Sequence, residues 1–280
     1  MIIAKQISFG YTKKDQVLNS LSLDLERPGI YGLLGKNGAG KTTLLKLLAG
    51  SLFPDRGQVY IDNVSTQERQ ITSRQQVYYL AEHLESPDWS AHRLGNIYGR
   101  LYPNFDHTRY LYYLDIFEVS PDTSHKSLSM GQQKKVEIAF ALATQVPYLF
   151  MDEPTNGLDI LSKKQFRRLI SQYISEEQLL IISTHQFREI DRVIDHLLIV
   201  DHKKLVLNQS LDDIGQQFLF TNTPMEDEQL LFQDEGMLGN YGLYTNPSKR
   251  DSTLDIELLF TAIHGCPDLL KNMQYYENNV

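Results

Sequence analysis

Cysteine is almost absent from this sequence, because Cys266 is the one cysteine among 280 residues. A single thiol cannot form an internal disulfide, which fits a reducing compartment. Long apolar runs are absent as well, since none approaches the roughly 18 residues that a membrane-spanning helix needs. Residues 1–11 also lack the basic region and long apolar stretch of a signal peptide. If the protein acts at a membrane, we expect partner chains to hold it there.

The sequence also lacks an excess of positive charge. It has 27 Lys and Arg residues against 35 Asp and Glu residues, which gives a formal net charge of −8. Proteins that coat nucleic acid usually carry a basic surface, so no nucleic-acid partner is expected. An anionic ligand must therefore be bound by a local arrangement of donors, because the overall field does not favour it.

Segments with strand and helix character alternate along most of the chain. Alternating apolar and polar residues in Ile2–Phe9 and Val17–Leu25 indicate an antiparallel start. The later alternation is typical of an α/β fold with a mostly parallel sheet. The expected later strands are Ile30–Leu34, Gly57–Asp62, Gln76–Ala81, Tyr148–Met151, Leu179–Ser183 and a closing hairpin, Leu197–Asp201 with Lys204–Leu207. The expected helices are Thr42–Ala49, Gly131–Gln145, Leu161–Ile174, Phe187–Ile194 and Asp255–Ile263.

Residues from about 83 to 145 are expected to form a helical insertion in this core. Apolar residues recur there at helical spacing in Leu94–Leu101 and Tyr110–Phe117, and aromatic residues are frequent. Their rings either pack the inside of the insertion or form a docking face for a partner. We expect the main domain to span residues 1–210 and a small appendage of undefined role to span residues 211–280.

A glycine-rich segment, GKNGAGKTT at positions 35–43, lies between a buried strand and a helix and fits the pattern G-x-x-x-x-G-K-[ST]. Glycines let backbone N–H groups converge on phosphate oxygens, and the helix start adds free donors. Lys41 would reach the β- and γ-phosphates, and the Thr42 hydroxyl would coordinate Mg²⁺. The segment indicates a site for a nucleoside triphosphate, and many families share it. Its predicted ligand-binding residues are Gly35, Asn37, Gly38, Ala39, Gly40, Lys41, Thr42 and Thr43.

The apolar strand Tyr148–Met151 runs into two adjacent acids, Asp152 and Glu153. Ligands of open α/β sheets bind beyond the carboxyl ends of the strands. Asp152 is therefore placed to hold Mg²⁺ through water, and Glu153 could position or deprotonate the attacking water. Two adjacent acids can also simply begin a loop, but the phosphate-binding segment favours the catalytic interpretation.

The segment Leu128-Ser129-Met130-Gly131-Gln132 opens an expected helix. Two roles are open for Ser129. It can be an N-cap and nothing more, or its hydroxyl beside the free N–H groups can also form an anion site. Placed between the phosphate-binding segment and the two acids, this pentapeptide resembles the signature L-S-G-G-Q of the ABC ATPases. Met130 stands in place of the first glycine. The resemblance separates this chain from other P-loop ATPases.

Further segments resemble that family in the same order. Ser183-Thr184-His185 is similar to the switch whose histidine assists at the γ-phosphate, and Tyr11 matches the aromatic residue that stacks on adenine. Glu82 stands where the family usually has glutamine and exporter-type relatives often have glutamate. The resemblance assigns this position to contact with Mg²⁺ or the attacking water. It covers about residues 1–210 and includes features of bacterial exporter-type subunits.

The resemblance implies an ATPase that uses ATP and Mg²⁺ and works as a pair. Ser129, Gly131 and Gln132 of one chain would cover the γ-phosphate held by Lys41 of the other, in a head-to-tail dimer. It makes Glu153 the base that activates water. Transmembrane permease subunits would be separate chains. The protein would then be cytoplasmic and peripheral on the inner face of the cell membrane, where it energises transport.

Two other functions remain open at this point. A soluble mechanochemical ATPase could act on ribosomes or DNA, and a regulatory module could bind ATP without hydrolysing it. Ribosome-acting relatives usually carry two ATPase domains and DNA-repair relatives long coiled coils, whereas this chain has one such domain and no sustained heptads. The presence of Lys41, Asp152, Glu153 and His185 together argues against lost hydrolysis. The substrate, the direction of transport and the identity of the second ATPase subunit stay open.

Overall fold

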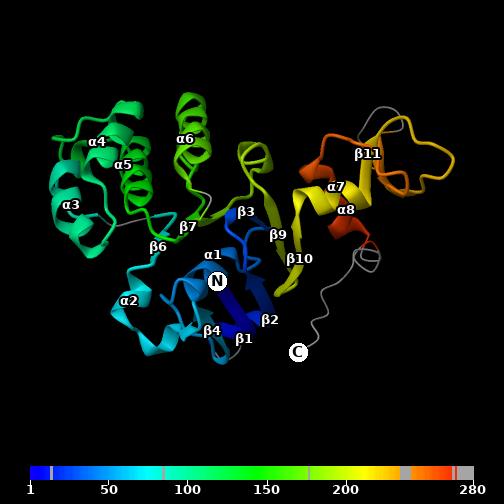
Figure 1. Ribbon diagram of the computed structural model, residues 1–280, viewed down its shortest axis with the longest axis horizontal. Coiled ribbons are helices and arrows are strands. Elements are labelled where there is room, and N and C mark those ends of the chain that lie inside the picture. Colours follow the sequence, from blue (N-terminus) through cyan, green and yellow to red (C-terminus); the bar gives the residue numbers. More distant parts are fainter. Residues whose placement is uncertain (13–14, 84–85, 176, 234–240, 267–268, 270–280) are drawn as a thin grey trace.

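In the computed structural model, which describes residues 1–12, 15–83, 86–175, 177–233, 241–266 and 269, two β-sheets form the main part of the chain (Figure 1). The smaller sheet is antiparallel and has the strand order β2-β1-β4-β5. Its strands are β1 (Ile2–Thr12), β2 (Asp15–Leu25), β4 (Arg56–Ile61) and β5 (Val64–Ser65). The expected antiparallel start is confirmed.

The larger sheet has the strand order β10-β9-β3-β8-β7-β6. Five of its strands pair in parallel: β3 (Gly29–Leu34), β6 (Val77–Leu80), β7 (Tyr148–Asp152), β8 (Leu179–Ser183) and β9 (His196–Asp201). β10 (Lys204–Ser210) closes one edge as an antiparallel hairpin with β9. Every residue of β7 and β8 is buried, as expected for parallel strands covered on both faces. The prediction of an α/β fold with a mostly parallel sheet is confirmed.

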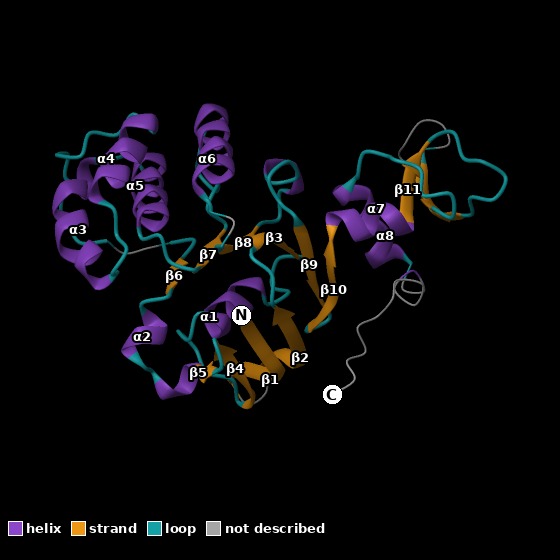
Figure 2. Cartoon of the chain, in the orientation of Figure 1, coloured by secondary structure: helices purple, strands orange, loops and turns teal. Residues whose placement is uncertain are grey.

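The two faces of the larger sheet belong to two different cores. Leu179 and Ile181 point into a core shared with the antiparallel sheet and α1 (Lys41–Leu48). Leu180 and Ile182 point into the core formed with α5 (Met130–Ala143) and α6 (Ile160–Tyr173), because successive side chains of a strand alternate between faces. Figure 2 shows these helices around the sheet. In the described part of the chain, no helix combines the length and apolar character that crossing a membrane requires.

The predicted helical insertion is present as α3 (Ala91–Tyr98), η2 (Gly99–Leu101), α4 (His107–Ile116) and η3 (His125–Ser127), which gather with α5 on one side of the molecule (Figure 1). Its aromatic residues divide into two groups. Tyr110, Tyr113 and Phe117 are buried, and the Tyr110 ring packs on Phe140 of α5 at 5.8 Å. Tyr98 and the other large exposed apolar side chains of this region lie at its surface. Packing therefore explains most of these rings.

The last part of the chain forms a small layer of its own. It contains α7 (Leu211–Gln217), β11 (Phe218–Thr221), β12 (Leu230–Phe232), β13 (Gly242–Thr245) and α8 (Ile256–Gly265). The three strands form an antiparallel sheet with the order β11-β13-β12, and Figure 1 shows this layer on the side opposite α3 and α4. α8 confirms the expected last helix. The strands were not predicted, and part of the appendage at 211–280 lies outside the described residues.

One predicted helix is wrong. Residues 187–194 contain only a short 3₁₀ helix, η4 (Phe187–Glu189), followed by turns. The chain must enter β9 soon afterwards, and Asp195 is already held against β3 by two hydrogen bonds to Ile30. Asp195 N–H donates to Ile30 O at 2.8 Å, and Ile30 N–H donates to Asp195 Oδ2 at 2.9 Å. Tertiary contacts thus override the helical periodicity. η1 (Thr66–Glu68) and α2 (Ile71–Arg74) were also not predicted.

Gly95 in α3 tests the packing of the insertion. A methyl group there would lie 2.8 Å from two ring atoms of the fully buried Tyr110. We expect Gly95→Ala to lower the free energy of unfolding by about 1–3 kcal/mol, because the ring has no free space to move into. Urea unfolding of the purified chain measures the change.

Gly215→Ala in α7 is the matched control, since the nearest atom to its added methyl group belongs to Leu254 at 3.9 Å. Alanine is the better helix former, so stability should stay the same or rise by up to about 1 kcal/mol. An equal loss in both variants would contradict the packing argument.

Candidate nucleotide-binding site

A cavity of about 480 Å³ opens at the carboxyl ends of the parallel strands. Segments that follow β3, β6, β7 and β8 meet there because parallel strands end at the same edge of a sheet. Its volume lies within the range of about 300–1,000 Å³ that is usual for ligand sites. The lining residues are Tyr11, Val17, Asn37, Gly38, Gly40, Lys41, Thr42, Thr43, Glu82, Glu153, Asn156 and His185.

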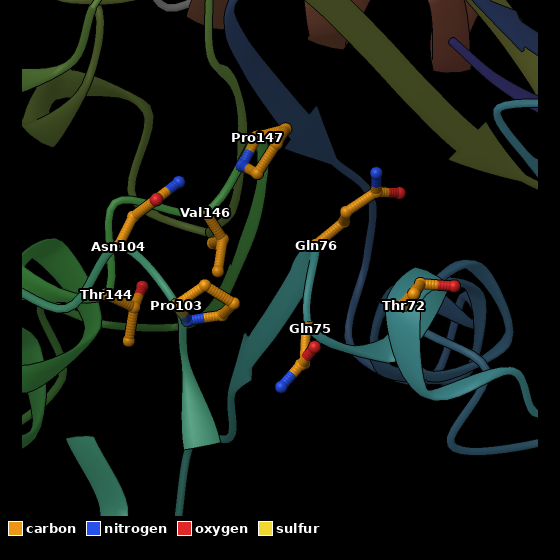
Figure 3. Close-up of a pocket in the computed structure, with 8 residues that line it drawn as sticks. All are labelled: Thr72, Gln75, Gln76, Pro103, Asn104, Thr144, Val146 and Pro147. Atoms are coloured by element: carbon orange, nitrogen blue, oxygen red, sulfur yellow. The ribbon is translucent and has the colours of Figure 1, made fainter. Parts of the chain in front are cut away.

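A second cavity, of about 290 Å³, lies at the opposite edge of the sheet, where β6 and β7 begin (Figure 3). Amide, hydroxyl and apolar side chains line it: Thr72, Gln75, Gln76, Pro103, Asn104, Thr144, Val146 and Pro147. Its lining carries no charged side chain to balance a phosphate. Of these two cavities in the described part of the chain, the one at the carboxyl edge combines a cation with converging backbone donors.

The loop between β3 and α1 has the form that a phosphate site requires. Gly38 has φ of 79°, and no atom lies within 4 Å of the position its side chain would take, so its backbone faces open space. A side chain on Gly35 would come within 2.6 Å of the Val200 carbonyl oxygen, so only glycine fits. Gly40 caps α1 without a side-chain hydrogen bond, which leaves the first N–H groups free for an anion. Ala39 lies in the same turn, where its N–H donates to Lys36 O at 3.0 Å.

Lys41 lies under this loop and is only 7% exposed. Its ammonium donates to Gly35 O at 2.8 Å and to Lys36 O at 3.4 Å. Burial lowers the pKa of Lys41, while the carboxylates of Glu153, Asp152 and Glu82 raise it. The cation thus faces acids across the cavity and is held by carbonyl oxygens that a phosphate group could replace.

Asp152 is buried beneath the cavity rather than on its wall, with 1% exposure. Its Oδ1 accepts a hydrogen bond from Ser183 Oγ at 2.5 Å, and its Oδ2 accepts one from Tyr79 Oη at 3.1 Å. Burial and the nearby carboxylate raise the pKa of the Tyr79 hydroxyl, which keeps it a donor. Each carboxylate oxygen retains a lone pair, so Asp152 can still bind a water molecule.

Glu153 comes next and turns into the cavity. Its φ of 45° is uncommon for a residue with a side chain, and its N–H donates to Ser183 O at 3.1 Å, which holds this conformation. Its Oε2 lies 3.0 Å from Nδ1 of His185. A carboxylate only accepts, so Nδ1 is the donor. The structure therefore brings Glu153 and His185, predicted separately from the sequence, into direct contact.

Four further lining residues form two separate contacts. Asn156 donates from Nδ2 to Glu82 Oε1 at 2.9 Å. The sequence analysis did not predict this contact, nor did it predict that Val17 lines the cavity. Asn156 stands in the loop after the two acids, but its partner depends on how β6 and β7 pair. Tyr11 is 57% exposed at the cavity mouth, with its Oη 3.3 Å from Thr43 Oγ1. An exposed ring at this place is available for stacking.

The signature-like segment does not line the cavity. Ser129 caps α5 in a capping box, since its Oγ accepts from Gln132 N at 3.3 Å and Gln132 Oε1 accepts from Ser129 N at 3.0 Å. Ser129 and Met130 are exposed. A side chain on Gly131 would lie 3.1 Å from Gly157 O in the loop after Glu153.

Comparisons with known proteins decide the family. The profile described as ABC transporter matches residues 18–156. A putative ABC transporter ATP-binding protein of Listeria monocytogenes is 33% identical over 213 residues, which cover 70% of this chain and 77% of that protein. The chain belongs to the ABC transporter ATP-binding protein family. The ABC transporter ATP-binding protein YtrB of Bacillus subtilis is 26% identical over 73% of this chain and 70% of its own length.

Solved structures agree with this family. An ATP-binding subunit of an ABC transporter superposes with a TM-score of 0.69 at 25% identity and covers 76% of this chain and 91% of its own. A dimeric ATP-binding cassette in a post-hydrolysis state with ADP and Pi has a TM-score of 0.67 at 21% identity, over 75% of this chain and 99% of its own. The fold is that of the P-loop ABC cassettes, and the protein is an ABC-type ATPase.

Lys41 tests the phosphate site of this ABC ATPase. We expect Lys41→Ala to weaken ATP binding by about 10- to 100-fold, because a buried charge-assisted hydrogen bond is lost. Titration calorimetry with ATP measures the change.

Lys36→Ala removes the same charge from an exposed position in the same loop and serves as the control. Its affinity should stay close to that of the unchanged protein. An equal loss in both variants would mean that the loop attracts ATP only by its total charge.

Proposed function

We propose that this ABC ATPase energises the movement of a substrate across a membrane, through transmembrane permease subunits that are separate chains. It would lie on the inner face of that membrane and act with a second ATPase subunit, either another copy or a related chain. The relatives support this proposal, because YtrB and the Listeria protein are named as ATP-binding proteins of ABC transporters. They disfavour the alternative of action on ribosomes or DNA.

One observation carries the pairing part of the proposal. Ser129 and Gly131 begin α5 outside their own cavity, and Ser129 is exposed. The helix start and the Ser129 hydroxyl together form an anion site. This site does not reach the nucleotide cavity of its own chain, so a phosphate bound there would not contact it. A second subunit that brings its bound ATP to this site would complete the nucleotide site of each subunit. Such a pair has a two-fold arrangement that uses the same surfaces twice. We assign the ATPase domain to residues 1–210, with the insertion at about 83–145, and the appendage to 211–280.

The proposed chemistry uses the residues that meet in the cavity. Lys41 and the free N–H groups of α1 would bind the phosphates and stabilise charge as it develops in the transition state. Glu153 would accept a proton from the attacking water. His185 would hold that carboxylate in place through Nδ1 and would assist at the γ-phosphate. Tyr11 would stack on the adenine ring.

The donors around the cavity fit Mg²⁺. Thr42, Glu82 and Asp152 offer the oxygen atoms that this hard cation prefers. Among the residues that the structure describes, no group of three or more His, Cys, Asp or Glu side chains could hold a metal ion. This suits a cation that takes most of its ligands from substrate phosphates and water. Bound Mg²⁺ would neutralise charge on the phosphate oxygens.

ATP would act as a joint between the two subunits. A nucleotide that contacts both chains binds the closed pair better than the open one and therefore shifts the population toward closure. Hydrolysis removes the shared γ-phosphate and with it the joint. The permease subunits would follow this opening and closing.

Glu153→Gln tests the hydrolytic role and the pairing together. The amide keeps the shape of the side chain but does not accept the proton, so turnover should fall by about 100-fold or more while ATP still binds. With the γ-phosphate retained, the ATP-bound pair should accumulate. A phosphate-release assay and size-exclusion chromatography with ATP check both effects.

Unchanged turnover in Glu153→Gln would refute the base assignment. Loss of turnover without pairing would leave the base assignment intact and contradict the shared ATP site.

A pull-down tests the transport function. The tagged chain is recovered from detergent-solubilised membranes of its source, beside an untagged control, and its partners are identified. We expect a multi-spanning membrane protein in near-equal amount. Recovery only from the soluble fraction, with ribosomal or DNA-bound partners, would overturn the transport proposal and leave the ATPase.

A further inference from the structure

The 3₁₀ helix η4 begins two residues after His185 and lies against α8 of the C-terminal appendage. The ring of Phe187 packs on the ring of Phe260 in α8, with centroids 4.8 Å apart. Next to it, Arg188 Nη2 lies 3.1 Å from Glu257 Oε2, on the preceding turn of α8. Two successive side chains of η4 are thus held by the C-terminal appendage.

The third residue of η4 faces the catalytic loops. Glu189 is 8% exposed and accepts a hydrogen bond from the Thr155 hydroxyl, two residues after Glu153. Its other carboxylate oxygen pairs with Lys163 of α6. Thr155 is itself 2% exposed, so a displacement of Glu189 would leave a buried hydroxyl without its partner. η4 therefore joins the segments that carry both His185 and Glu153.

Apolar packing makes the contact between α8 and this region continuous. Leu258 and Leu259 of α8 are buried in the same core as Ile190 and Ile194, which follow η4. Close-packed interiors transmit small displacements, because side chains have little free volume to absorb them. The position of α8 is in this way linked to the position of η4.

We propose that the C-terminal appendage sets the geometry of ATP hydrolysis through α8, with Phe260 as a positioning residue. Phe260 holds η4, and η4 sets His185 directly and the loop after Glu153 through Glu189. This inference rests on the proposed roles of His185 and Glu153. A partner or permease that moves α8 would change the rate of hydrolysis without touching the nucleotide. Phe260 itself lies outside the residues that line the cavity.

Phe260→Ala in the full-length chain is the first test. Loss of the ring contact should lower kcat for ATP about tenfold, because small misplacements of catalytic groups are costly, and leave the dissociation constant for ATP unchanged. Phe260→Leu keeps much of the apolar contact and should recover most of the rate. Met225→Ala, which truncates an exposed apolar side chain elsewhere in the appendage, should leave kcat unchanged.

An exchange of charges tests the same link without a core change. Arg188 and Glu257 are 87% and 54% exposed, so their substitution should not unfold the chain. Arg188→Glu should lower kcat about two- to fivefold, as exposed charge pairs are weak, and the double variant with Glu257→Arg should restore it. Equal rates in the single and double variants would contradict the proposal.

His185→Ala separates this inference from the function on which it rests. In that background Phe260→Ala should lower kcat by a smaller factor than in the unchanged protein, since the route through His185 is gone and only the route through Glu189 and the loop after Glu153 remains. If the two losses multiply, Phe260 acts independently of His185 and the positioning role is overturned. If His185→Ala leaves turnover unchanged, the proposed role of His185 fails first. If His185→Ala abolishes turnover and Phe260→Ala retains full kcat, only the further inference fails.

Discussion

The parallel pairing of β7 with β8 is the constraint on which the catalytic edge depends. Asp152 pairs with Ser183 in register, and Ser183 also bonds to Asp152 through its hydroxyl at 2.5 Å and to the N–H of Glu153 at 3.1 Å. These bonds fix where both strands end. Glu153 and His185, each just past its strand, then come within hydrogen-bond distance. A shift of one residue in this register would move the side chains of the shifted strand to the other face and so separate Glu153 from His185.

Charge is arranged locally in a protein whose net charge opposes its ligand. The chain carries −8 overall, and Glu82 and Glu153 add negative charge to the wall of the cavity. Lys41 and the free N–H groups of α1 supply the attraction instead, at short range and partly shielded from water, where it is strongest. The acids that face Lys41 would be neutralised by a cation bound with the phosphates. Binding of the phosphates with their cation would thus also balance the negative charge of the acids in this site.

Several residues combine a structural contact with a proposed functional one. Ser129 and Gln132 form the capping box of α5, yet Ser129 is also exposed, as the proposed contact with a second subunit requires. Glu189 satisfies the buried Thr155 hydroxyl and so links the loop after Glu153 to η4. Such dual use explains why loops with little secondary structure of their own are firmly held around the cavity. It also gives the appendage a physical route to the catalytic groups.

Most of the α/β core and most of the site residues could be predicted from the sequence, because glycine spacing, apolar strands and the acids that end them are local patterns. Lys41, Asp152 and Glu153 were recognisable in this way. Two contacts were not recognisable: that of Glu82 with Asn156, 74 residues apart, and that of Phe187 with Phe260, 73 residues apart. Whether such distant segments meet depends on strand order and core packing. The same reason accounts for the false helix at 187–194. There, the hydrogen bonds between Asp195 and Ile30 of β3 outweighed the local helical periodicity. Those bonds join residues far apart in the sequence, so the periodicity of the short segment alone could not reveal them.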